Sequence, residues 1–505
     1  MKDVAGILFF VLMHTLIALG QAQTSIKVDC NNEKFTMAGG IGASWHSISL
    51  DQEHIDISPE YKQAYRVRNS RGSAWGGNPP VEHTAAWEQI YDHAAWLGLS
   101  WLRVELSMRM YQPEKDKFDW DNEEMQALYK ILDWAETNGA DVFLQQMWSN
   151  VKWNSYPDVQ PLISAPKSME DYAEGLATLA DYLLNEKKYS CIKWLCLTNE
   201  PPGGTWGHWW SSTEHGRNTP LTPALKAVRE ALDEKNLNIQ ISGPDWTDLP
   251  PFDEDKIDFD EYIGAYDIHS YHGLDAAKQK EVAKWAKWAH MHGKPLFLSE
   301  IGRQDLVVGL KNPESTKTGQ VTSIAESLAN AEAILRGMAV GVGAFNRWSF
   351  TNRGDLDGQW QLIRTWNIEE KTYYKTIQSE PVSYYGYGII SRFVPKYSTI
   401  VFTDPINNPD ILSQTIRTTG EDLTTIILNK SDQEQTIILN MKGIGDLTFY
   451  MYRAIQEEII QPGFKMNPVH EMKIKNEEEV TLTLPPESIH TLTTMHLLHD
   501  DPAKR

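Results

Sequence analysis

An eightfold alternation of short apolar runs with longer amphipathic segments is the feature that most constrains the fold. Several runs are apolar almost throughout, as strands buried on both faces of a parallel sheet are. Eight strands alternating with helices predict an α/β fold, a (β/α)8 TIM barrel. A doubly wound sheet is the alternative, but no GxGxxG motif follows an early strand. The predicted strands are Met37–Ser44, Trp101–Leu106, Asp141–Gln146, Ile192–Leu197, Ile239–Ser242, Tyr266–His269, Leu296–Ser299 and Ala344–Trp348.

A second pattern begins after Ser383, where the runs become shorter and often alternate between apolar and polar residues. Such segments, separated by turn residues, predict a C-terminal antiparallel β-sandwich. The expected division of the 505 residues is a signal peptide (1–22), a catalytic barrel (37–380), a sandwich (381–498) and a tail (499–505). The predicted sandwich strands are Tyr384–Phe393, Ser413–Thr418, Leu423–Asn429, Gln435–Asn440, Leu447–Tyr452, Glu479–Leu484 and Ser488–His496.

The N-terminus has the pattern of an export signal. Lys2 precedes an apolar run, Ala5–Leu19, and the small residues Gly20 and Ala22 suit cleavage after Ala22. An N-terminal membrane anchor is the alternative. No second apolar run follows, so we expect no membrane span in the mature chain and a periplasmic or secreted location.

Charge and cysteine content exclude other classes of protein. The net charge of −21 disfavours nucleic acid as a partner, because phosphate binding needs a clustered basic surface. Three cysteines, Cys30, Cys191 and Cys196, are an odd number and do not make a disulfide framework. No HExxH or comparable ligand spacing occurs, so we expect neither a metal nor another cofactor.

Two carboxylates occupy matching positions at the ends of strands. Glu200 and Glu300 each follow an apolar run, and the carboxyl ends of barrel strands are where catalytic groups lie. Glycoside hydrolysis needs such a pair, one carboxyl group to protonate the leaving oxygen and one to attack the anomeric carbon or activate water. The pair therefore predicts a carbohydrate substrate.

The motifs around these glutamates carry a resemblance to a known group of enzymes. Leu197–Pro201 (LTNEP) and Leu298–Glu300 (LSE) resemble the strand-four and strand-seven signatures of the clan A retaining glycoside hydrolases. The resemblance implies that Glu200 is the general acid/base and Glu300 the nucleophile. It also implies that Asn199 binds the sugar 2-hydroxyl, that Arg103 lies beside the nucleophile, and that His269 and Tyr271 belong to the site.

Within the clan, the chain is most similar to glycoside hydrolase family 30. Gly39–Ser44 resembles its glycine-rich first strand, and Trp148–Trp153 its Trp-Ser segment after strand three. That likeness implies that the N-terminal segment 23–36 joins the sandwich. Families 5 and 39 are alternatives, because Ser299–Gly302 (SEIG) is closer to theirs.

Aromatic and spare acidic side chains complete the predicted site. Flat aromatic faces suit the apolar faces of sugars, so Trp45, Trp148, Trp206 and Trp348 are candidate subsite residues. Asp245 closes a strand, and we expect it to position the substrate or its neighbours. Glu105 has the same interpretation.

The predicted reaction is double displacement on β-linked glycosides through a covalent glycosyl-enzyme, which requires carboxyl groups about 5–5.5 Å apart. We expect Arg103 to favour the charged form of Glu300, and the negative charge of Glu300 to raise the pKa of Glu200. One alternative is a non-catalytic carbohydrate-binding barrel, which predicts the loss of one carboxylate. Another is a Schiff-base aldolase, which needs a lysine at a strand end. The oligomeric state stays open.

Overall fold

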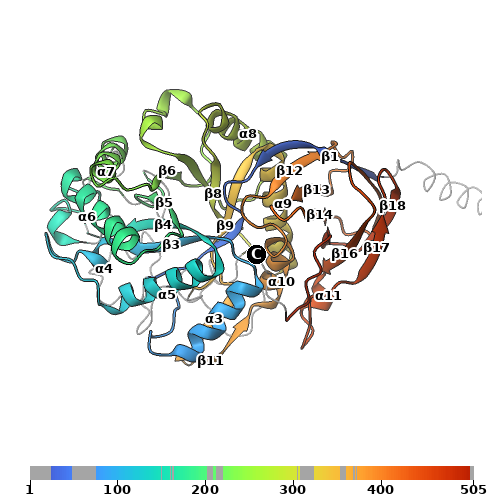
Figure 1. Ribbon diagram of the computed structural model, residues 1–505, viewed down its shortest axis with the longest axis horizontal. Helices are drawn as coiled ribbons and strands as arrows, with labels where there is room; N and C mark the ends of the chain where they lie inside the picture. Colours follow the sequence, from blue (N-terminus) through green and yellow to red (C-terminus); the bar gives the residue numbers. More distant parts are fainter. Residues whose placement is uncertain are drawn as a thin grey trace, which may run out of the picture.

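The chain forms a closed barrel and a separate large sheet that lie side by side (Figure 1). The computed structural model describes residues 24–47, 76–148, 151–159, 161, 164–201, 209–211, 220–303, 305–306, 323–352, 360–367, 370 and 372–500. Within them, eight parallel strands close the barrel in the order β2 to β9, and nine strands form the second, mostly antiparallel sheet. The predicted (β/α)8 barrel with a C-terminal sandwich is confirmed.

Each of the eight predicted apolar runs overlaps one barrel strand. The circle closes where β2 pairs with β9, with Ile41 opposite Phe345. The strands are β2 (Ile41–Ser44), β3 (Trp101–Ser107), β4 (Asp141–Trp148), β5 (Ile192–Cys196), β6 (Gln240–Trp246), β7 (Ala265–Ser270), β8 (Leu296–Ile301) and β9 (Val342–Arg347).

Helices surround the barrel at the positions that the amphipathic segments predict. The side chain of Asn122 caps α5 by accepting a hydrogen bond from the Met125 N–H at 3.0 Å, and Gly139 ends it in a left-handed conformation with φ 67°. The helices are α3 (Thr84–Trp96), α4 (Met108–Tyr111), α5 (Glu123–Asn138), α6 (Met169–Asp181) continued by a π-helical turn (Tyr182–Glu186), α7 (Thr222–Glu234), α8 (Ala276–Met291) and α9 (Ile324–Val340). Short 3-10 turns span Lys152–Asn154, Glu254–Lys256 and Asp260–Tyr262.

The barrel interior is filled by aromatic side chains near the amino ends of the strands and by polar side chains near their carboxyl ends. Trp101 lies with its ring 5.0 Å from Phe297 and 5.5 Å from Phe143. Two residues further along β3, at the next inward position, stands Arg103. An apolar lower layer therefore supports a charged layer at the carboxyl ends of the strands.

One predicted strand is wrong. Tyr384–Phe393 lies mostly on a helix, α10 (Pro381–Ser391), and not on a strand of the sandwich. Pro381 suits the first helical turn. The segment is apolar all round because α10 is buried on several sides, against Trp96 of α3, helix α9 and strands β16 and β19. Periodicity cannot separate a fully buried helix from a buried strand.

The second sheet is built largely from the C-terminal part of the chain, with one strand from the N-terminus. β1 (Thr24–Thr36) runs parallel to β15 and antiparallel to β12. The sheet order is β17-β16-β19-β14-β13-β12-β1-β15-β18. Its other strands are β12 (Thr399–Thr403), β13 (Ile411–Arg417), β14 (Leu423–Asn429), β15 (Gln435–Lys442), β16 (Leu447–Ala454), β17 (His470–Ile474), β18 (Glu479–Leu484) and β19 (Ser488–Thr493). A short helix, α11 (Gln456–Ile459), follows β16.

Both faces of this sheet carry apolar residues. Ile426 joins the hydrophobic core that continues into the barrel, whereas its neighbour Ile427 joins a separate core inside the sandwich. A hairpin of β10 (Ile363–Asn367) and β11 (Thr372–Ser379) precedes α10. Among the described residues, none of the helices has the length and apolar character that crossing a membrane requires.

Candidate active site

The predicted catalytic glutamates meet at the carboxyl ends of the barrel strands. Glu200 follows β5, and Glu300 lies near the end of β8. A carboxylate oxygen of each and a ring nitrogen of His269 all lie within 4.8 Å of one another. The glutamates are 4% and 3% exposed, whereas His269 is fully buried. The two carboxylates therefore form the outermost layer of a buried charged cluster.

His269 and Tyr271, at the end of β7, bind the carboxylate pair. The Nδ1 atom of His269 lies 2.9 Å from Glu200 Oε1 and 3.3 Å from Glu300 Oε2. The Tyr271 hydroxyl donates to Glu300 Oε2. His269 thus bridges the two carboxylates, and the tyrosine orients one of them.

Arg103 is the cation at the centre of the cluster. Its Nη1 atom lies 2.6 Å from Glu300 Oε1 and 2.7 Å from Glu105 Oε1. Its Nη2 atom donates to Asn199 Oδ1 at 2.9 Å and lies 3.7 Å from Asp245 Oδ2. Because Asn199 accepts this bond, its amide NH2 group is the part that can donate to a ligand.

Backbone strain positions the acidic groups. Glu200 and Asp245 both have positive φ, 48° and 58°, which non-glycine residues rarely adopt. The Glu200 N–H donates to Asp245 Oδ2 at 3.3 Å, and so does the Gln145 side chain. Such conformations cost about 1–3 kcal/mol and persist where surrounding contacts impose them. Asp245 therefore holds Glu200 in place as well as meeting His269 at 2.9 Å.

Burial dominates the electrostatics of Glu300. Burial raises the pKa of Glu300 to about 7, although the positive charges of Arg103 and His269 lower it and the Glu200 carboxylate adds to the rise. The sequence predicts that Arg103 favours the charged form, which it does, but the desolvation effect is larger. Glu300 therefore keeps its proton to a higher pH than an exposed glutamate does.

The surroundings of His269 favour its charged form. Burial opposes its charged form, but the carboxylates of Glu300 and Asp245 raise its pKa well above the usual range. An imidazolium donates from both nitrogens. In that form it can bond Asp245 through Nε2 and the carboxylates of Glu200 and Glu300 through Nδ1 at the same time.

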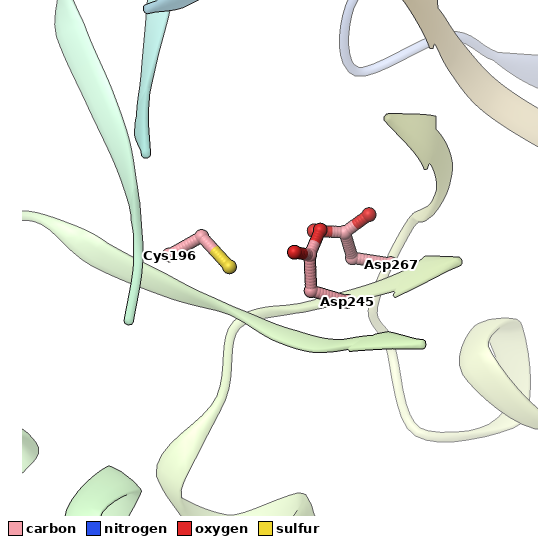
Figure 2. A group of neighbouring side chains, drawn as sticks. All are labelled: Cys196, Asp245 and Asp267. Carbon is pink, nitrogen blue, oxygen red and sulfur yellow. The ribbon is translucent and has the colours of Figure 1, made fainter. Parts of the chain in front are cut away.

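A second buried group lies below the first. Figure 2 shows Cys196 of β5 pointing toward the carboxyl groups of Asp245 on β6 and Asp267 on β7. Burial, and then the charge of Asp245, raise the pKa of Asp267 to about 8. Burial also opposes ionisation of Asp245, but His269 and Arg103 lower its pKa. Asp267 is thus a protonated acid that hydrogen-bonds the ionised Asp245.

Potential metal ligands converge in both groups, since Cys196, Asp245 and Asp267 also lie within 4.8 Å of one another. Their atoms have protein partners. Ser242 donates to Asp267 Oδ2 at 2.9 Å, and Cys196 Sγ donates to the Thr198 carbonyl at 3.4 Å.

Asp267 is a member of the buried cluster that the strand-end motifs do not identify. Asp267, His269 and Tyr271 occupy alternate positions of one strand segment, and Arg103 and Glu105 do the same on β3. Alternation places such residues on one face of a strand. Polar residues at every second position of an otherwise apolar run are the signal that could have identified Asp267.

The predicted aromatic residues have different positions. Trp348 follows β9 at the cluster, with its ring 4.7 Å from that of His46 and 5.9 Å from the Arg103 guanidinium carbon. Trp206 lies outside the described residues, and Trp148 is described only as the last residue of β4. Trp360, which is not among the predicted aromatic residues, packs edge-on against Tyr271 at 5.5 Å.

Trp45 does not belong to the site, so its prediction as a sugar-binding residue is wrong. It is fully buried, and its ring lies 5.0 Å from Phe350, 5.7 Å from Trp134 and 6.4 Å from Trp87. Its Nε1 donates to Asn78 at 3.2 Å. Trp45 directly follows β2. Successive side chains of a strand point to opposite faces, so Trp45 points outward into the helix layer while its neighbours point inward.

Comparison with known proteins agrees with this architecture. The cellulase (glycosyl hydrolase family 5) model matches residues 59–331. Among solved structures, a GH30 endoxylanase from Clostridium papyrosolvens C71 is 14% identical, with a TM-score of 0.61 over 93% of this chain and 99% of that chain. An endo-β-1,6-glucanase is 14% identical (TM-score 0.56, 94% of each chain). A GH39 β-xylosidase from Caulobacter crescentus is 10% identical (TM-score 0.55, 93% and 99%). A search of curated proteins found no match.

Proposed function

This chain belongs to the cellulase family, glycosyl hydrolase family 5, and on that premise we propose that it hydrolyses β-linked glycosides with retention of configuration. It is a glycosidase of clan A, as the sequence motifs predict. The matching family model is that of family 5, which is one of the two alternatives to family 30 that the sequence motifs leave open. The structural resemblance to family 30 and family 39 enzymes extends over the barrel and the sandwich.

The observation that carries the proposal is the close approach of the two carboxylates. Oxygen atoms of Glu200 and Glu300 lie within 4.8 Å of each other. Retaining enzymes place their carboxyl groups about 5–5.5 Å apart, whereas inverting enzymes leave about 6.5–9.5 Å for a water molecule. The spacing supports direct attack by one carboxylate on the sugar.

In the proposed first step, the Glu300 carboxylate attacks the anomeric carbon while Glu200 donates its proton to the departing glycosidic oxygen. The glycosyl–Glu300 ester forms as the bond to the leaving group breaks. In the second step, Glu200 takes a proton from water, which attacks the anomeric carbon and releases Glu300. Asn199 donates to the sugar 2-hydroxyl, and Trp348 offers an apolar face to the ring.

Two matched variants test these roles. Glu200→Gln and Glu300→Gln are assayed on a panel of dinitrophenyl β-glycosides, whose leaving group needs little acid assistance. Glu200→Gln is expected to form the glycosyl-enzyme and to hydrolyse it about 10²–10⁴-fold more slowly than wild type. Glu300→Gln is expected to form none. Mass spectrometry after reaction with 2-fluoro-glycosides locates the adduct on the Glu300 peptide.

A matched control is Glu332→Gln. Glu332 lies on α9, away from the site, and forms ion pairs with Arg336 of the same helix and with Lys430, which directly follows β14. Near-normal turnover by Glu300→Gln, or first release of the α-anomer by NMR, contradicts the proposal. Sugar binding without turnover by the wild type would instead support the carbohydrate-binding barrel.

We also propose that the protein acts after export. The support is the apolar run Ala5–Leu19 with its small-residue cleavage site, in a segment outside the described residues. Sequencing the N-terminus of the protein from a periplasmic or culture fraction is expected to give Gln23 as the first residue. Recovery of an intact Met1 from the exported fraction would contradict cleavage.

A further inference from the structure

A buried chain of three side chains leads to the catalytic carboxylate Glu300. His46 Nδ1 lies 2.7 Å from Glu105 Oε2, and Glu105 Oε1 lies 2.7 Å from Arg103 Nη1. The same Nη1 atom lies 2.6 Å from Glu300 Oε1. The side chains of His46, Glu105 and Arg103 are all fully buried. The chain runs from the end of β2 through β3 to β8.

Two carboxylates therefore compete for one guanidinium nitrogen. Although burial opposes its ionisation, His46 and Arg103 lower the pKa of Glu105, so Glu105 remains an anion. A permanent anion at 2.7 Å offsets part of the positive charge that Arg103 presents to Glu300. In a water-excluded site this competition is weakly screened.

His46 fixes the position of Glu105. Asn78 donates through its side chain to the His46 carbonyl oxygen. The His46 ring also packs edge-on against Trp348, at 4.7 Å between centroids. The carboxylate of Glu105 thus lies between the imidazole of His46 and the guanidinium of Arg103.

The other groups that face Glu300 come from β5, β6 and β7. Glu200 and Asp245 bring negative charge, which raises the pKa of Glu300, and His269 brings positive charge, which lowers it. Tyr271 donates a hydrogen bond to it. These groups contact or surround Glu300 directly, whereas the side chain of Glu105 reaches it only through Arg103.

Resting on the proposed function, we propose that Glu105 is a positioning residue that divides the charge of Arg103 and so keeps Glu300 basic enough to attack the sugar. A carboxylate with an undivided guanidinium partner is a weaker base and a weaker nucleophile. His46 serves the same purpose by holding Glu105 against Arg103.

The test is the pH profile of kcat/KM on a dinitrophenyl β-glycoside that the wild type hydrolyses. Glu105→Gln keeps the shape of the side chain and removes its charge. Its acidic limb is expected to move about one pH unit lower, with a several-fold fall in kcat, because the charge of Arg103 is then no longer offset by Glu105 and acts more strongly on Glu300. Glu105→Asp keeps the charge but withdraws it, so we expect a smaller shift in the same direction.

Glu124→Gln is the matched control, since Glu124 is 3% exposed and forms a two-bond pair with Arg109 between α4 and α5. Its acidic limb is expected to coincide with that of the wild type. An acidic limb that stays at the wild-type pH, or moves higher, in both Glu105 variants overturns the proposal. If Glu105→Gln does not fold, Glu105→Asp alone decides. A wild type without turnover would overturn the proposed function instead, so the two failures are distinct.

Discussion

Individual residues of the charged cluster work against the stability of the fold. Burial raises the pKa of Glu300 to about 7 and that of Asp267 to about 8. A buried carboxyl group with a raised pKa holds a proton that the unfolded chain releases. The contribution of these groups to folding stability is therefore largest at a pH below their pKa in the unfolded chain. It is lost as the pH rises through their higher pKa in the folded protein. Under the proposed function, Glu200 and Glu300 are maintained for chemistry rather than for stability.

A pH-dependent stability difference follows for Glu300→Gln. The amide resembles the protonated acid, so the variant avoids the cost of an ionised, buried Glu300. We expect it to melt several degrees above wild type at pH 8, with the difference shrinking toward pH 4.5. Calorimetry or fluorescence melting over this range measures it. The exposed Glu471→Gln on β17 is the control and should show no such trend. A variant less stable than wild type at pH 8 would contradict the raised pKa of Glu300.

Aromatic packing between elements anchors the barrel to its helices. Trp45, directly after β2, contacts Trp87 and Tyr91 of α3 and Trp134 of α5. Edge-on contacts between such rings add to the stability from burial. The same short segment places His46 against Glu105, on the opposite side. Consecutive residues thus serve the helix layer and the active site.

Two tryptophan variants are expected to have different effects, one on stability and the other on substrate binding. Trp45→Phe should lower the free energy of unfolding by about 1–3 kcal/mol, because it leaves a cavity and removes the bond to Asn78. Its KM and kcat at 25 °C should stay near wild type. Trp348→Phe should raise KM while losing less stability. Urea unfolding and steady-state kinetics check both expectations. If KM rises for Trp45→Phe and not for Trp348→Phe, Trp45 contributes to substrate binding and the expectation is contradicted.

One hydrophobic core extends from the barrel to one face of the second sheet, and a separate core lies on the other face of that sheet. Helices α9 and α10 pack on the sheet, and Lys430 bonds Glu332 of α9 at 2.8 Å. The N-terminal strand β1 completes the sheet between β12 and β15, although those strands are far from it in sequence. The sheet therefore depends on both ends of the chain.

A comparison within β1 measures this dependence. Ile26 is fully buried in the core of the sandwich, whereas its neighbour Lys27 is exposed. Ile26→Ala is expected to lower the free energy of unfolding by about 2–5 kcal/mol, and Lys27→Ala to change it little. Denaturant unfolding followed by tryptophan fluorescence compares the two. Equal effects would show that β1 contributes little to the sheet.

Local patterns in the sequence were sufficient for much of the architecture. The eight apolar runs, the helices between them and the positions of Glu200 and Glu300 at strand ends follow from periodicity and strand geometry. The resemblance of the strand-end motifs to those of clan A enzymes implies a place in the site for Arg103, Asn199, His269 and Tyr271, and the structure brings all four to the carboxylate pair. Each of these inferences needs only neighbouring residues.

Tertiary structure alone decided the rest, because burial and charge depend on residues that are distant in sequence. Helix α10 and Trp45 were misassigned since an apolar segment does not reveal which elements will cover it. The raised pKa of Glu300 and the division of the charge of Arg103 arise from groups on five strands that meet only when the barrel closes. Desolvation and Coulomb energy are properties of that closed arrangement, and no linear pattern encodes their balance.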